Sequence, residues 1–168
     1  MNYKDIKLND GQVIRVWMPP TVKITTVLAK KYQAPEIPIV EVKTAAGETE
    51  RIQVVDDPTY LAEKKRVDEA RDKERDEWYY LYALRDVQVP ADFDVEVYRP
   101  IAEIEDENWQ PREGQRGRKL DYLEWELMGD PSNYNKIQQA LVAMMTTDEE
   151  TIGLIEESFR SDVAGSTA

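Results

Sequence analysis

The most constraining feature of this sequence is a charged stretch in its middle. In residues 63–77, thirteen of the fifteen side chains carry a charge. A segment of this composition is typical of a solvated helix, because ionised side chains are seldom buried and opposite charges three or four residues apart support a helix. Asp57 precedes it as a helix cap, and Pro58 suits the first helical position. We therefore predict one long, exposed helix from Pro58 to Asp86, within a segment spanning residues 57–86.

Two β-hairpins are predicted ahead of this helix. In residues 3–18, apolar side chains flank an Asn-Asp-Gly sequence, whose glycine supplies the positive φ angle that a tight turn needs. A second pair of apolar runs, between residues 37 and 55, flanks an Ala-Ala-Gly-Glu turn. Between the hairpins, the apolar spacing of residues 21–32 is helical. We predict a small antiparallel sheet with one helix packed on it, over residues 1–56.

Residues 87–119 are predicted to be an extended or loop connection. Residues 92–97 alternate acidic and apolar side chains, which is the pattern of a half-buried strand. Residues 99–119 contain prolines and glycines, and they include a basic cluster of Arg112, Arg116, Arg118 and Lys119. Because the pattern of a phosphate-binding loop is missing and the chain is acidic, we interpret these cations as a solvated or salt-bridged loop.

The last third of the sequence is predicted to be helical. Leucines at helical spacing end at Gly129, an Asp-Pro pair at residues 130–131 repeats the cap-and-proline start, and Thr147 opens a capping box. We predict a helical unit over residues 120–163 and a disordered tail over residues 164–168. The whole chain is therefore expected to be α+β, with a hairpin sheet and helix first, the long charged helix next, and a helical C-terminal part.

Composition argues against several classes of function. The sequence has no histidine and no cysteine, so it lacks the usual general base near neutral pH, the Ser–His and Cys–His pairs, and the commonest zinc ligands. The acidic groups at residues 92–96 and 103–107 lack the glycine and distal glutamate of a calcium loop. We expect no enzyme, no cofactor and no metal site. No run of about 18 apolar residues predicts a membrane span.

The net charge of −12 is distributed unevenly. Residues 1–55 carry eight basic and six acidic side chains, whereas residues 56–168 carry 14 basic and 28 acidic ones. Such a chain is repelled by the phosphate backbone, so we expect no general nucleic-acid binding. Solubility is the simplest interpretation of the acidity, and attraction to a basic partner or mimicry of nucleic acid are the alternatives. The lack of cysteine and of an N-terminal apolar run fits a cytoplasmic protein.

An aromatic run at the end of the long helix is the best candidate for a contact surface. The run is Trp-Tyr-Tyr-Leu-Tyr, and five consecutive helical residues point all around the axis, so one core face cannot hide all of them. Trp and Tyr are also enriched at binding hot spots. We predict that Trp78, Tyr79, Tyr80 and Tyr82 include the anchor of a protein contact. Burial of this helix end from several sides is the alternative.

The order of motifs resembles the small tail assembly chaperones of long-tailed (siphovirus-type) bacteriophages. The shared features are an opening KLNDGQVIRVWMPP hairpin, VVDDPTYLAEKKR leading into a long charged helix, and a closing MMTTDEETIGLIEESF. The resemblance implies a non-catalytic protein of the host cytoplasm, absent or scarce in mature virions, which keeps the tape-measure protein soluble while the tail tube assembles. The tail tube protein and a second copy of the chain are further candidate partners.

Two other functions fit the same sequence. One is a minor structural protein of the virion, in the tail or connector, which would stay in the particle. The other is an acidic inhibitor that imitates DNA to occupy a host nuclease, which the charge of residues 56–168 would favour.

Overall fold

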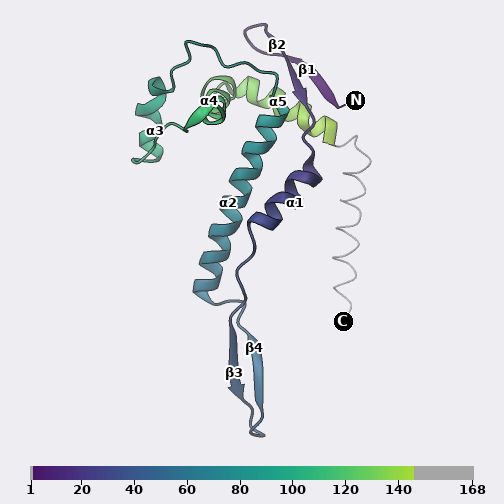
Figure 1. Cartoon of the computed structure of the whole chain (residues 1–168), viewed down its shortest axis with the longest axis vertical. Coiled ribbons are helices and arrows are strands. Elements are labelled where there is room, and N and C mark those ends of the chain that lie inside the picture. Colours follow the sequence, from purple (N-terminus) through teal and green to yellow (C-terminus); the bar gives the residue numbers. More distant parts are fainter. Residues whose placement is uncertain (1, 146–168) are drawn as a thin grey trace. The chain divides into compact units, whose positions relative to one another are not determined.

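The computed structural model describes residues 2–145 (Figure 1). Within them the chain is α+β, as predicted, with five α-helices and two antiparallel sheets of two strands each. The chain divides into two compact units. The first combines the residues up to Pro19 with those from Tyr79 onward, and the second spans Pro20–Trp78. The predicted capping box at Thr147 and the predicted tail at residues 164–168 lie outside the described residues.

The first unit begins with the predicted hairpin, formed by β1 (Tyr3–Lys7) and β2 (Val13–Trp17). Gly11 in its turn has a φ angle of 88°, which is the left-handed conformation that glycine adopts readily. The two faces of the hairpin differ in burial. Ile14 and Val16 are buried, whereas Val13 on the opposite face of β2 is exposed and Arg15 and Trp17 are half-buried. One face of this hairpin therefore belongs to a core.

The region predicted as an extended or loop connection, residues 87–119, is partly helical. It contains the 3₁₀ turn η1 (Val95–Tyr98), α3 (Arg99–Glu105) and the first part of α4 (Gly114–Tyr122). The strand predicted at residues 92–97 is thus wrong. Local bonds explain the difference.

The carboxylate of Asp94 accepts the backbone N–H of Glu96 at 3.0 Å and closes a turn. Arg99 then pairs with Glu96 at 2.6 Å and with Glu103 at 3.1 Å, three and four residues away. Both spacings bring side chains together on a helix and not on a strand.

Helix α4 continues into a π-helical turn, η2 (Leu123–Leu127), and α5 (Pro131–Met145) follows. The predicted start of α5 is confirmed, because the Asp130 carboxylate accepts the backbone N–H of Ser132 at 2.8 Å and of Asn133 at 3.2 Å. Asn9, at the tip of the first hairpin, donates its side-chain amide to both Asp130 oxygens at 2.9 and 2.8 Å. Together these bonds hold the pKa of Asp130 below its ordinary value.

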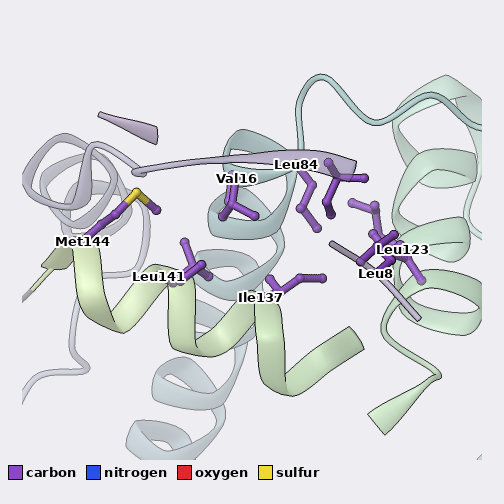
Figure 2. Packing of buried hydrophobic residues seen from close by; sticks show 11 residues of the cluster. Leu8, Val16, Leu84, Leu123, Ile137, Leu141 and Met144 are labelled. Atoms are coloured by element: carbon purple, nitrogen blue, oxygen red, sulfur yellow. The ribbon is translucent and has the colours of Figure 1, made fainter. Parts of the chain in front are cut away.

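One apolar cluster joins the N-terminal hairpin to the C-terminal helices (Figure 2). Figure 2 shows Ile137, Leu141 and Met144 along α5, near Val16 of β2 and Leu84 just after α2. The buried members of the cluster are Leu8, Ile14, Val16, Ala83, Leu84, Leu123, Leu127, Ile137, Ala140, Leu141 and Met144. This differs from the predicted N-terminal unit of residues 1–56, because the hairpin shares its core with residues more than a hundred positions away.

The second unit contains α1 (Thr21–Lys31), the hairpin of β3 (Ile39–Lys43) and β4 (Thr49–Gln53), and most of α2 (Pro58–Ala83). The two predicted hairpins form two separate sheets and not one. In α1, the buried side chains are Ile24 and Leu28. The end of α1 is fixed to α2, because the Lys31 ammonium lies 2.6 Å from the Glu74 carboxylate, which also accepts the Tyr32 hydroxyl.

Helix α2 confirms the predicted long charged helix. The Asp57 carboxylate accepts the backbone N–H of Tyr60 at 2.8 Å, and the helix ends at Ala83, three residues before the predicted end. Exposed ion pairs such as Lys64–Asp68, at 2.6 Å, run along its surface. Among residues 2–145, no helix combines the length and apolarity needed to cross a membrane.

Candidate protein-binding surfaces

The four aromatic residues that we predicted as a protein contact differ in their burial. Tyr80 is half-buried and packs against the core, and the Gln138 amide donates to its hydroxyl. Trp78 and Tyr79 are also half-buried, and the boundary between the two units falls between them. Tyr82 is exposed. Burial thus accounts for Tyr80, and Tyr82 remains the most accessible of the four as a predicted contact.

Tyr82 belongs to a stacked group of aromatic rings and guanidinium groups. The Arg85 guanidinium carbon lies 4.7 Å from the centre of the Tyr82 ring and 3.8 Å from that of Trp17. The Trp17 indole N–H donates to the Asp86 carboxylate at 2.7 Å. Each exposed cation–π contact contributes about 0.5–1 kcal/mol. These contacts fasten the first hairpin to the residues after α2, so a structural role explains most of the group.

The hairpin of β3 and β4 exposes all ten of its strand residues. Its register places Val40 opposite Ile52 on one face, with Val42 beside them. The other face carries the ion pair of Glu41 and Arg51, at 3.1 Å. One face therefore carries three apolar side chains and Glu50, the other carries Ile39 among polar side chains, and neither face is buried. We call Val40, Val42 and Ile52 the hairpin face.

The hairpin face has the chemistry of a binding surface. Val40, Val42 and Ile52 are 45%, 44% and 46% exposed, whereas Ile14 and Val16 of the first hairpin are 6% and 0% exposed. Each strand also has a single neighbour, so the outer backbone edges of β3 and β4 stay unpaired within the described part of the chain. An isolated two-stranded hairpin is only marginally stable in water. Apolar side chains and open edges together suit the capture of another polypeptide segment.

A second apolar surface lies on η1 and α3. Val97, Ile101 and Ile104 are 70%, 56% and 84% exposed, and their spacing of four and three residues aligns them along one side of a helix. The same short helix buries Ala102, which is 2% exposed. Large apolar side chains thus point away from the protein. We call Val97, Ile101 and Ile104 the α3 stripe.

The base of α3 is held by aromatic rings. The Tyr98 ring stacks on Trp125, with centres 5.5 Å apart and planes 18° apart, and Trp109 meets Trp125 edge-on at 6.2 Å. A hydrogen bond with the Glu126 carboxylate, together with burial, raises the pKa of Tyr98 to about 12. The Arg99 guanidinium also lies over Trp109, at 5.4 Å from the ring centre. These contacts fix the direction in which the α3 stripe points.

Two cations of the predicted basic segment, Arg112 and Lys119, bind other groups of the same chain. The Arg112 guanidinium lies 2.7 Å from the carboxylate of Asp121, a residue only 1% exposed, and 2.7 Å from that of Glu124. Lys119 donates to the backbone carbonyl of Arg85 at 2.8 Å. The interpretation as a salt-bridged segment is confirmed for Arg112. Among residues 2–145, no three acidic side chains gather closely enough to hold a metal ion.

Comparison with known proteins adds no constraint on these surfaces. No protein-family model, curated protein or solved structure matches the chain. The hairpin face and the α3 stripe are therefore judged by their own chemistry.

Neither apolar surface was predicted as a site from the sequence. The strands of the second hairpin show an apolar content close to that of the first, so no local pattern distinguishes a hairpin that packs on a core from one that does not. Val97, Ile101 and Ile104 are spaced for a helix, but the alternation of acidic and apolar side chains in residues 92–97 favours a strand. The helical period across residues 95–105 is the signal in the sequence that indicates the stripe.

Proposed function

We propose that this chain is a non-catalytic, protein-binding protein, a tail assembly chaperone of a long-tailed bacteriophage that keeps the tape-measure protein soluble during assembly of the tail tube. The hairpin face supports this proposal most strongly. Three branched apolar side chains remain 44–46% exposed there, on a sheet of two strands with open edges. Contiguous exposed apolar side chains are a feature of protein-interaction sites.

The expected client has matching chemistry. In the chaperones that this chain resembles, the client is a long helical protein whose apolar seams are exposed before the tail encloses them, and such seams aggregate. The hairpin face can cover an apolar seam. The excess of acidic side chains, 34 against 22 basic ones, keeps a complex of the two chains charged and dispersed.

Replacing Ile52 by glutamate should abolish this protection. The substitution places a carboxylate in the centre of the hairpin face, and loss of an interface anchor commonly weakens binding by 2 kcal/mol or more, about thirtyfold. The measurement is the soluble fraction of the tape-measure protein of the same phage when it is co-expressed with each variant. The wild-type chain should keep it in the supernatant, and Ile52→Glu should leave it in the pellet.

The neighbouring residue provides a matched control. Gln53→Glu adds the same charge to the same strand, but on the opposite face of the exposed hairpin, so it should protect the client as the wild-type chain does. A client that stays insoluble beside the wild-type chain would contradict the proposal. Equal protection by Ile52→Glu would show that the hairpin face is not used.

Two further measurements separate the alternative functions. Mass spectrometry of mature virions should find the chain absent or scarce, whereas a fixed copy number per particle would identify a minor structural protein. Displacement of the chain from its partner by double-stranded DNA would identify a DNA mimic. We expect that DNA does not displace it.

A further inference from the structure

We propose that the α3 stripe and the acidic side chains around it form a second docking surface, which binds a basic amphipathic helix of another protein. This inference goes beyond the proposed function, because it concerns a different surface and does not require the tape-measure protein to be the partner.

The α3 stripe is suited to binding a helix. Val97, Ile101 and Ile104 are aligned at helical spacing and are 56–84% exposed. Apolar side chains at this spacing on one helix pack against an apolar stripe on another helix. The stacked rings of Tyr98 and Trp125 hold the α3 stripe in place before any partner binds. Binding therefore requires little ordering of α3, which favours affinity.

The charge around the stripe selects the partner. Residues 92–107 contain seven acidic side chains and a single basic one, Arg99, whose guanidinium already pairs with Glu96 and Glu103. Glu105 and Glu107, at the end of α3 and just beyond it, are exposed, and neither forms an ion pair within the described range 2–145. Their carboxylates are available to lysine and arginine side chains beside an apolar stripe.

The same charge disfavours other occupants. A second copy bound through this surface would bring two acidic rims together, which is unfavourable. Nucleic acid would be repelled for the same reason. Residues 146–168 of this chain carry six acidic side chains and one basic one, so they do not complement the rim either. A helix with an apolar stripe between rows of lysine or arginine satisfies both features of the surface.

The test uses the full chain and a fluorescein-labelled Leu/Lys peptide of about 18 residues, with its leucines at helical spacing. Fluorescence anisotropy should show saturable binding that weakens between about 50 mM and 200 mM salt, because exposed charges are screened. The expected change is a loss of affinity of at least about fivefold for Ile104→Ser, and separately for Glu105→Gln combined with Glu107→Gln.

Matched controls separate recognition from general attraction. Val13→Ser removes a comparably exposed apolar side chain, at 63%, and Glu36→Gln with Glu48→Gln removes the same two negative charges outside the surface. Both should bind the peptide within about twofold of the wild-type chain, as expected for substitutions outside the contact. Circular dichroism should confirm that all variants are folded.

Several outcomes would overturn the inference. They are the absence of binding, equally tight binding of a peptide of the same composition with alternating leucines, and unchanged affinity of Ile104→Ser. A fourth is dissociation of a dimer by Ile104→Ser in sedimentation experiments without peptide, which would make a second copy the occupant. The Ile52→Glu variant should bind the peptide normally, so this test and that of the hairpin face can fail independently.

Discussion

Replacing Asp121 by alanine should lower the free energy of unfolding by about 3 kcal/mol, although the residue lies in no candidate binding surface. Its carboxylate accepts the Arg112 side chain at 2.7 Å and the Arg112 backbone N–H at 3.0 Å. Asp121 is 1% exposed, and the Arg112 side chain is 29% exposed. Removing the carboxylate leaves the Arg112 backbone N–H without its acceptor and the partly buried guanidinium with Glu124 in place of two carboxylates, which is costly.

Urea unfolding followed by circular dichroism provides the measurement. The control is Glu41→Ala, which removes an ion pair between side chains that are 59% and 75% exposed. Such a pair is worth less than about 1 kcal/mol, because water and salt screen it. If Asp121→Ala costs no more than Glu41→Ala, then the ion pair does not hold the segment before α4 in place.

Replacing Ile137 by alanine should cost about 3–4 kcal/mol, because the side chain is removed from a packed core and leaves a cavity. Ile137 is fully buried in the cluster that β1, β2 and α5 share. The loss should therefore also reduce the protection of the β1 and β2 amides against hydrogen exchange. Urea unfolding and exchange measured by mass spectrometry test the two effects.

Val142→Ala is the matched control on the same helix. Val142 is 57% exposed, so its truncation should change stability by less than about 0.5 kcal/mol. If Ile137→Ala destabilises α5 but leaves the exchange of β1 and β2 unchanged, then the N-terminal hairpin and the C-terminal helices do not share one core.

Elements governed by local chemistry could be predicted from the sequence. The Asp-Pro starts at Asp57 and Asp130 each give a helix whose cap accepts backbone N–H groups. Gly11 and Gly47 give hairpin turns with φ angles of 88° and 83°. In each case the deciding interaction joins residues within a few positions of one another, so a short window of sequence contains it.

Long-range pairing could not be predicted in this way. Asn9 bonds to Asp130 across 121 positions, and nothing near either residue indicates the other. Gly117 differs in that its contact is local, yet the sequence does not reveal it: a Cβ atom there would lie 2.7 Å from the backbone carbon of Arg112. The sequence shows a glycine in a supposed loop, whereas the structure uses it to bring the Arg112 segment against α4.

The candidate sites illustrate the same limit. An aromatic run predicts that its side chains are covered. The sequence does not show whether the core of the same chain or another protein covers them. For Tyr80, the packing partners include the core of its own unit. The hairpin face and the α3 stripe are recognised by exposure, a property that only the folded chain has.

Affinity capture from infected cells tests the central proposal most directly. Tagged wild-type, Ile52→Glu and Gln53→Glu chains serve as baits, and mass spectrometry quantifies the tape-measure protein on each. The wild-type and Gln53→Glu chains should enrich it equally, and Ile52→Glu should retain at least about tenfold less, as expected for loss of an interface anchor. No enrichment on the wild-type chain, or equal enrichment on Ile52→Glu, would contradict the proposal that the hairpin face binds this client.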